Sequence, residues 1–213
     1  MRVSIVVSCF NNSHTACHMS MLCLDHIRKF TDPPYQLIVV DPAPKFPIRD
    51  DYKTLMLEND PDTIWLKPNP DPGYTGGMNL GAEHATGEVL VFIQNDVFVR
   101  EGWLKDMLWY IDHGFECIFP DQVPRDRNYV LATYKRKMDD PETLKGGRDA
   151  GCMMITKKAF EKNGKWDETL GLLAERNFYE MGYKNSISWT DTNKVLITHV
   201  MAATNLDLLD KDP

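Results

Sequence analysis

The sequence lacks any long hydrophobic run, and this absence limits the classes of protein to which it can belong. No stretch approaches the roughly 18 apolar residues that a membrane-spanning helix needs. The first apolar run, over residues 3–10, is followed at once by Asn11, Asn12 and Ser13, so it is too short for a secretion signal. We therefore expect a soluble protein with no membrane span.

Cysteines in pairs are also missing. The five cysteines are Cys9, Cys17, Cys23, Cys117 and Cys152, and no two of them have CxxC spacing. An odd number without paired spacing argues against a disulfide framework and against a zinc site. Several lie in apolar runs, as small buried side chains do. This pattern predicts a reducing compartment, the cytoplasm.

An excess of basic residues is absent as well. Asp and Glu number 31 against 24 Lys and Arg, which gives a formal charge of -7. The only tight basic cluster spans residues 134–137, so we expect no nucleic-acid partner. With 213 residues, 43% of them hydrophobic, the chain is long enough to bury a core.

Hydrophobic periodicity predicts alternating strands and helices in the first half of the chain. The expected strands are residues 3–10, 35–40, 53–57 (a weak one), 64–66 and 89–93, and the expected helices run from Ser13 to Phe30 and over 78–84. A strand, a helix and a second strand within about 40 residues favour a right-handed βαβ unit and hence a parallel sheet.

The second half is more irregular and more polar. The expected elements are a helix over 102–111, a strand over 117–119, a long polar excursion over 121–144, a glycine-flanked strand over 146–156, helices over 157–162 and 174–181 (the latter closed by Gly182), and strands over 186–189 and 195–199. The pattern is α/β with a mostly parallel central sheet flanked by helices. We expect a single domain over 1–213, with a nucleotide-binding half over about 1–100, an acceptor-binding half over about 101–205, and a tail or linker to further domains over 206–213.

Two segments are candidates for chemistry. The buried strand at 89–93 delivers Gln94, Asn95 and Asp96 at its carboxyl end, where open α/β sheets bind ligands. These residues are either a metal- or phosphate-handling group or a polar turn. In the second segment, residues 67–81, prolines restrict the backbone of the first half and glycines make the backbone of the second half flexible. It either presents backbone N–H groups to a phosphate or is an ordinary turn, and it has neither GxGxxG nor GK[ST] spacing.

The order of these motifs resembles the large inverting glycosyltransferase family with the GT-A fold, family 2. The similar segments, which cover nearly the whole chain, are residues 4–11, 37–41, 69–81, 87–97, 102–104, 151–155, 166–168, 182–184 and 195–199. The chain is also similar to glycosyltransferase domains encoded by large algal viruses, which would place it in a host cytoplasm.

The resemblance implies a UDP-sugar donor and a divalent cation, Mn²⁺ or Mg²⁺. The residues that it places at the donor are Ser8, Phe10, Asn11, Asp41, Asn69, Gly76, Gly77, Asn79, Gln94 and Asn95. Asp96 and His199 are the implied metal ligands. For Asp41 and His199 a purely structural role at a strand end stays open.

Two departures from the family pattern concern the acids. Gln94 replaces the first acid of the family's DxD motif, and the Glu-Asp pair that normally supplies the base is missing as a pair. Glu175 is therefore our candidate base and Asp149 the second candidate. For Glu175 a purely structural role, as a helix-start carboxylate stabilised by the helix dipole, stays open.

The resulting hypothesis is transfer of a hexose or deoxyhexose from a UDP-sugar to a hydroxyl of a glycan or glycoprotein acceptor. The alternative is a catalytically impaired domain that binds nucleotide sugars or glycans. A nucleotidyltransferase ranks last because residues 8–16 lack its Arg- and Lys-bearing glycine loop.

Overall fold

The computed structural model describes residues 1–42, 45–60, 62–124 and 151–200. Its strands are β1 (Val3–Ser8), β2 (Gln36–Val40), β3 (Ile64–Leu66), β4 (Val89–Gln94), β5 (Val97–Phe98), β6 (Cys117–Pro124), β7 (Cys152–Thr156) and β8 (Trp189–His199). Its helices are α1 (His14–Phe30), α2 (Asp50–Asn59), α3 (Gly73–His84), α4 (Trp103–Asp112), α6 (Lys157–Lys162), the short 3₁₀ helix η2 (Gly171–Leu173) and α7 (Ala174–Lys184).

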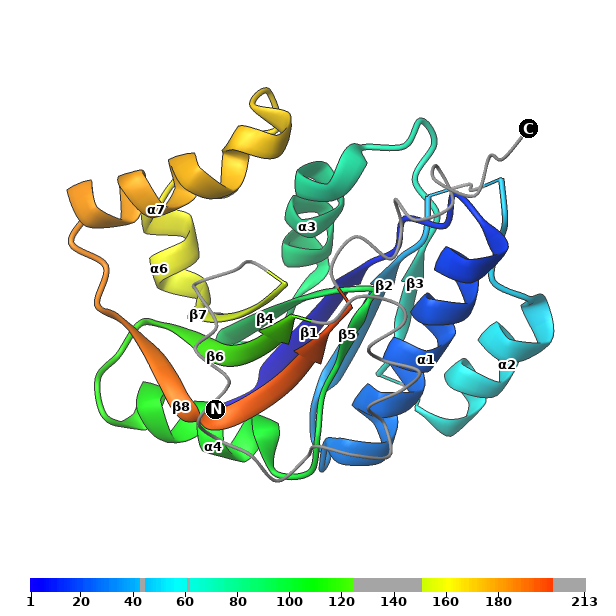
Figure 1. The fold of residues 1–213 in the computed structure, drawn as a ribbon, viewed down its shortest axis with the longest axis horizontal. Coiled ribbons are helices and arrows are strands. Elements are labelled where there is room, and N and C mark those ends of the chain that lie inside the picture. The colour runs from blue at the N-terminus through cyan, green and yellow to red at the C-terminus, as the bar shows by residue number, and fades with distance from the viewer. Residues whose placement is uncertain (43–44, 61, 125–150, 201–213) are drawn as a thin grey trace.

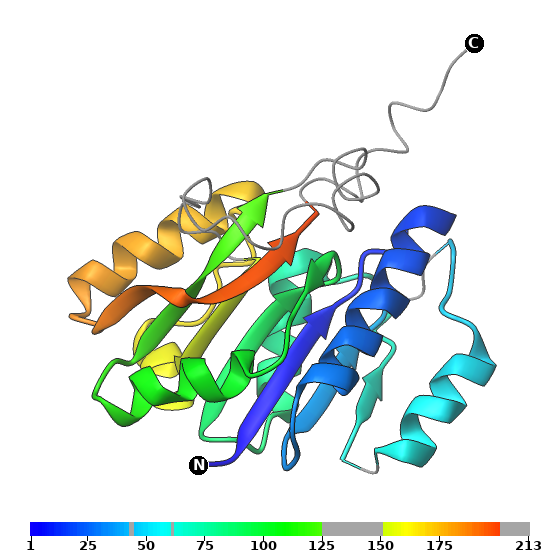
Figure 2. The same cartoon turned by 60° about the horizontal axis from the view of Figure 1, so that its bottom comes forward.

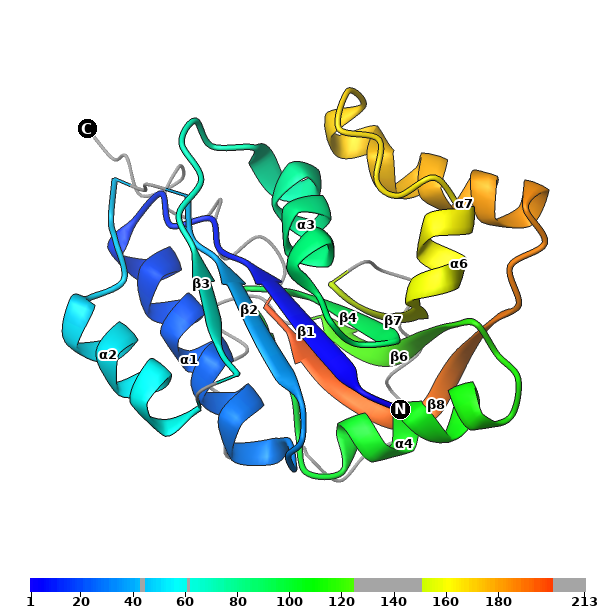
Figure 3. The same ribbon diagram turned by 180° about the vertical axis from the view of Figure 1, so that it is seen from behind.

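The strands form one sheet in the order β3-β2-β1-β4-β7-β6-β8-β5. Four of its seven neighbouring pairs are parallel, and Figure 3 shows β3, β2 and β1 side by side at one end. The antiparallel pairs join β7 to β4 and β6, and β5 to β8. The predicted α/β architecture with a mostly parallel sheet is confirmed.

Helices cover both faces of the sheet, which explains why its central strands are apolar without alternation. In β1, Ile5 and Val7 pack in a core with α1 and α4, while Val6 packs in a second core with α3, α6 and α7. In Figure 2, α1 and α4 lie in front of the sheet and α3 lies behind it. In Figure 1, α6 and α7 lie on the same side as α3.

The start of α1 follows the predicted capping chemistry. The Ser13 hydroxyl accepts a hydrogen bond from the Ala16 N–H at 3.0 Å, which satisfies one of the free donors of the first turn. The expected burial of the cysteines is confirmed too, because all five are buried, and none forms a disulfide. Among the described helices, none has the length and apolarity needed to cross a membrane.

The prediction of a weak strand near residues 53–57 is wrong, because these residues belong to α2. Asp50 and Asp51 occupy the first turn, where carboxylates interact favourably with the helix dipole. Lys53 and Met56, three residues apart, are its buried positions. This is a helical rather than an alternating spacing.

The second half differs from the prediction at several boundaries. The two strands expected at 186–189 and 195–199 are one strand, β8, whose pairing with β6 shifts register between Pro120 and Asp121. The irregularity interrupts the apolar pattern and makes one strand look like two. The polar excursion was expected from residue 121, but β6 continues to Pro124, and residues 125–144 of the predicted excursion lie outside the described residues.

Glycine boundaries were also misplaced. Helix α7 passes through Gly182 to Lys184, and α3 starts at Gly73 rather than at Met78. A Cβ on Gly182 would come within 2.7 Å of the Trp189 ring, so this glycine permits close packing instead of ending the helix.

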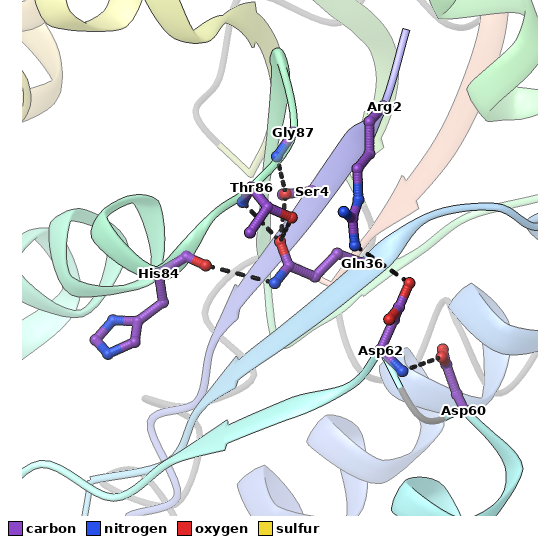
Figure 4. A network of polar contacts seen from close by, with 8 residues as sticks. All are labelled: Arg2, Ser4, Gln36, Asp60, Asp62, His84, Thr86 and Gly87. Atoms are coloured by element: carbon purple, nitrogen blue, oxygen red, sulfur yellow. Dashed lines mark hydrogen bonds and ion pairs between the residues drawn. The ribbon is translucent and has the colours of Figure 1, made fainter.

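A buried polar network ties the amino ends of β1, β2 and β4 together (Figure 4). The Gln36 side-chain oxygen accepts hydrogen bonds from the Ser4 hydroxyl at 2.6 Å and from the Thr86 N–H at 2.9 Å. Ser4 in turn accepts from the Gly87 N–H at 2.9 Å. Because Ser4 and Gln36 are buried, each of these groups depends on its partner.

We expect Gln36→Met to lower the free energy of unfolding by about 2–4 kcal/mol, because it leaves the Ser4 hydroxyl and the Thr86 N–H without an acceptor. Urea denaturation measures the loss. The control is Asp62→Asn, which breaks the exposed ion pair with Arg2 at 3.3 Å and should cost less than about 1 kcal/mol. Equal losses in the two variants would contradict this account of the network.

Candidate active site

A cleft of about 570 Å³ lies at the carboxyl ends of β1 and β4, where the sequence placed the site. Its lining residues are Ser8, Cys9, Phe10, Asp71, Pro72, Gly73, Tyr74, Thr75, Gln94, Asn95, Asp96, Glu168, Gly171 and Glu175. The cleft thus brings together strand ends, the first turn of α3 and the segment that leads into α7.

The predicted metal ligands meet at the β4 edge of this cleft. Strand β8 pairs with β5 so that His199 lies opposite Val97, the residue after Asp96. His199 Nε2 lies 3.3 Å from Asp96 Oδ1 and 3.1 Å from Gln94 Oε1. Both His199 and Asp96 are buried, with side chains 6% and 5% exposed. The structure thus brings Gln94, Asp96 and His199 together at one corner, and the role of Asp96 and His199 as metal ligands stays a prediction.

This corner fits a small divalent cation. Two neighbouring ligands of an octahedral cation with bonds of about 2.0–2.1 Å are about 3 Å apart, close to the separation of His199 Nε2 and Asp96 Oδ1. Carboxylate and amide oxygens suit Mg²⁺ and Mn²⁺, and the imidazole favours Mn²⁺. Among the described residues no group of three His, Cys, Asp or Glu side chains is placed to hold a metal. The remaining ligands would therefore have to come from outside this pair.

Behind the cleft, Asn95 and Asn11 belong to one buried hydrogen-bond chain. The Asn95 amide donates to the Ser20 hydroxyl at 2.7 Å, and that hydroxyl donates to Asn11 Oδ1 at 2.6 Å. The Asn11 amide donates to Asp41 Oδ1 at 3.3 Å. This series of hydrogen bonds connects the carboxyl ends of β4, β1 and β2 through Ser20 on α1. Ser20 was not predicted, although a hydroxyl on the apolar face of α1 was a usable signal.

Asp41 is a buried carboxylate with donors on both oxygens. Besides Asn11, the Trp65 indole N–H lies 3.2 Å and the Lys53 ammonium 3.4 Å from Asp41 Oδ2. Burial raises the pKa of the Asp41 carboxyl, and Lys53 opposes that rise. Neither Asp41 nor Asn11 lines the cleft.

The glycines of α3 let the helix approach the sheet. A Cβ on Gly77 would overlap the Ser8 hydroxyl, and one on Gly81 would overlap Val6. Gly76, Gly77 and Asn79 are buried and lie outside the cleft lining, whereas Gly73, Tyr74 and Thr75 form its wall. Asn69 is exposed and does not line the cleft either.

Asn79 instead bonds to the segment that carries Glu168. Its amide donates to the Trp166 carbonyl at 2.9 Å and to Glu168 Oε1 at 2.7 Å, and its carbonyl accepts from the Trp166 N–H at 3.1 Å. Glu168 was not among the predicted site residues, although residues 166–168 were recognised as a motif. The missing signal was the long-range contact with Asn79.

Two glutamates face the cleft, and one is the predicted base. Glu175 occupies the first turn of α7 and accepts a hydrogen bond from the Tyr179 hydroxyl at 2.7 Å. Glu168 is the other. Asp149, the second candidate base, lies outside the described residues.

A family model described as glycosyl transferase family 2 matches residues 4–168. No curated protein sequence matches the chain.

Three solved structures share the fold. S. aureus TarS 1–349 has a TM-score of 0.71 at 14% identity, over 100% of this chain and 67% of that one. A Pyrobaculum calidifontis mannosyltransferase, PcManGT, solved with GDP-Man and Mn²⁺, has a TM-score of 0.70 at 17% identity, over 93% and 56%. GalNAc-T7, solved with UDP, GalNAc and Mn²⁺, has a TM-score of 0.70 at 15% identity, over 93% and 43%. The fold is thus GT-A, and the chain spans between two fifths and two thirds of these solved chains.

We expect Lys53→Met to destabilise the protein by about 3 kcal/mol at pH 7, because it leaves the buried Asp41 carboxylate without its cationic partner. Without the ammonium, the pKa of Asp41 in the folded state rises further above its value in the unfolded chain. The folded state then holds a proton that the unfolded chain releases, so stability falls as pH rises above the ordinary Asp value.

Thermal denaturation between pH 4 and pH 8 measures this effect. Lys158→Met, at an exposed lysine, is the control and should leave the pH profile unchanged. A Lys53→Met profile parallel to that of the wild type would contradict the assignment.

Proposed function

Because the chain belongs to glycosyl transferase family 2, we propose that it transfers a hexose or deoxyhexose from a UDP-sugar to a hydroxyl of a glycan acceptor. The observation that carries this proposal is the contact of His199 with Asp96 and Gln94 at the edge of a cleft that also holds two glutamates. Nucleotide-sugar transfer requires a place for a cation and a carboxylate within reach of an acceptor. The cleft offers both.

The donor would lie across the carboxyl ends of β1 and β4. Phe10 is 47% exposed at the cleft and offers a ring face to a uracil. Ser8, Gln94 and Asn95 line the same cleft beside it. A related fold has been solved with UDP-GlcNAc bound, that of TarS, and this favours a UDP-sugar here. We propose that Asn11 and Asp41 stabilise the strand ends behind the cleft, because their side chains form a hydrogen bond there.

Asp96 and His199 would hold Mn²⁺ or Mg²⁺, which neutralises the leaving diphosphate as a Lewis acid when bound. Gln94 contributes a neutral oxygen beside them, so among the described residues of this corner Asp96 alone brings a formal negative charge. The diphosphate oxygens of the donor would supply further ligands to the cation.

Glu175 acts as the base. As the acceptor oxygen bonds to the anomeric carbon, the bond from that carbon to the diphosphate breaks and the acceptor proton passes to the Glu175 carboxylate. A single displacement of this kind inverts the anomeric configuration. The Tyr179 hydroxyl, 2.7 Å from Glu175 Oε1, orients the carboxylate at the edge of the cleft.

The second candidate function is a domain that binds nucleotide sugars or glycans without turnover. It is favoured by Gln94, which leaves a single carboxylate, that of Asp96, among the residues of the metal corner that the structure describes. Binding without transfer to any acceptor would identify it.

The wider setting follows as part of the proposal. We place the donor in residues 1–100 and the acceptor in the half that starts at about residue 101. The tail or linker predicted over 206–213 lies outside the described residues. A cytoplasmic location, within a host cell if the chain is viral, accords with five buried cysteines that form no disulfide.

We expect Glu175→Gln to keep UDP-sugar affinity within about threefold while sugar transfer falls by about 10²–10⁴-fold, since only the proton acceptor is lost. Release of UDP, measured with and without acceptor, gives the rate, and calorimetry gives the affinity. Glu180→Gln on the same helix, whose carboxylate pairs with Arg176 at 2.9 Å on the surface, is the matched control and should keep full activity. Unchanged turnover in Glu175→Gln would refute Glu175 as the base.

We expect Asp96→Ala to lose metal-dependent UDP-sugar binding and hydrolysis together, because the variant lacks the carboxylate proposed to bind the metal. Titration of the variant with Mn²⁺ in the presence of UDP measures the loss. Full activity at ordinary Mn²⁺ concentration would remove Asp96 from the metal site.

A further inference from the structure

We infer that Glu168 reads the hydroxyl groups of the transferred sugar, and that Asn79 is the positioning residue that holds it there. This inference rests on the proposed function. It assigns a binding residue to the sugar ring of the donor, which the proposed contacts with the phosphates and the nucleobase do not involve. The ligand chemistry is that of a neutral pyranose with hydroxyl donors.

The first observation is the way the Glu168 carboxylate is anchored. Its Oε1 accepts from the buried Asn79 amide at 2.7 Å. Within the described part of the chain no other hydrogen bond and no ion pair reaches this carboxylate. One oxygen is therefore fixed, while Oε2 keeps its full capacity to accept hydrogen bonds at a residue that lines the cleft.

The second observation is the rigidity of the segment around it. Asn79 bonds to both the N–H and the carbonyl of Trp166, so one amide side chain makes three hydrogen bonds to residues 166–168. The Asp167 carboxylate accepts from the N–H and the hydroxyl of Thr169 at 3.0 and 2.6 Å. A carboxylate held in this way loses little side-chain entropy when a ligand binds.

The third observation is the close approach of Glu168 to α3. A Cβ on Gly76 would lie 3.3 Å from Glu168 Oε2 and 2.8 Å from Pro72. Gly76 follows the residues Gly73, Tyr74 and Thr75, which form the α3 wall of the cleft. The glycine thus makes room for the carboxylate at the wall of the first turn.

The negative charge of Glu168 determines which part of the donor its carboxylate can contact favourably. A carboxylate without a cation partner repels a diphosphate, so it is unsuited to the phosphates. Sugar hydroxyls are neutral donors, and an ionised carboxylate accepts from them more strongly than a neutral oxygen does. Because Glu168 lies against α3 and Glu175 lies on α7, we assign Glu168 to the donor sugar and Glu175 to the acceptor.

The test compares UDP with UDP-sugars, because UDP lacks only the part that Glu168 is expected to contact. Calorimetry with Mn²⁺ present would measure the affinity of wild type, Glu168→Gln and Glu161→Gln for UDP, UDP-glucose, UDP-galactose, UDP-N-acetylglucosamine and GDP-mannose. Glu161 is an exposed glutamate on α6, outside the cleft lining, and serves as the control.

For the sugar that the wild type binds best, we expect Glu168→Gln to weaken binding by about tenfold or more, the value of a hydrogen bond to a charged group. UDP affinity should stay within about twofold in both variants. Asn79→Ala should reproduce the sugar-specific loss, and the Asn79→Ala, Glu168→Gln double variant should lose no more than either single variant.

Unchanged sugar affinity in Glu168→Gln, or an equal loss for UDP and UDP-sugar, would overturn the inference. A fall in kcat with unchanged affinity would also overturn it, because Glu168 would then act as a base. A wild type that binds neither UDP-sugars nor GDP-mannose would instead refute the proposed function. Since Glu168 is exposed, Glu168→Gln is expected to fold, and its thermal midpoint checks this.

Discussion

The short antiparallel pairing of β5 with β8 is the constraint on which the site depends. It sets His199 opposite Val97 and so brings an imidazole against the carboxylate of Asp96, the residue that directly precedes β5 in the turn after β4. The Val200 N–H also donates to the Asp96 carbonyl at 3.0 Å, which fixes the main chain on both sides of the contact. A buried carboxylate requires a compensating partner, and the last described strand supplies it.

The remainder of the site is held by contacts between elements that are distant in sequence. Ser20 on α1 connects Asn95 with Asn11, and Lys53 on α2 approaches Asp41 at the end of β2. On the opposite face, glycines bring α3 close to β1, and Asn79 connects α3 with the segment before α7. The helices on both faces therefore position the floor and the rims of one cleft, and the sheet supplies the common frame.

The central features could be predicted from the sequence because they follow from local patterns. An unbroken apolar run ending in Gln94, Asn95 and Asp96 predicts a buried strand with polar residues at its carboxyl end, and the strand and the cleft are where that pattern places them. The capping hydroxyl of Ser13 and the apolar face of α1 are equally local.

The features that could not be predicted depend on contacts between distant residues. Lys53 was assigned to a strand because a hydrophobic pattern does not reveal a buried lysine. Its ammonium is buried beside the Asp41 carboxylate, which is distant in the sequence. Strand β8 was divided because a register shift opposite β6 interrupts its alternation. Glu168 was overlooked as a site residue because its anchor, Asn79, lies on another element. Gly182 was taken as a helix end because its close neighbour, Trp189, is on the next strand.

The most direct measurement is a crystal structure of the protein with UDP and Mn²⁺, with data collected to locate manganese by its anomalous scattering. We predict one manganese peak within bonding distance of Asp96 and His199, in contact with the diphosphate of UDP in the cleft. Manganese and UDP bound elsewhere, or UDP bound in the cleft with no metal beside Asp96, would contradict the metal-diphosphate corner on which the proposed function depends.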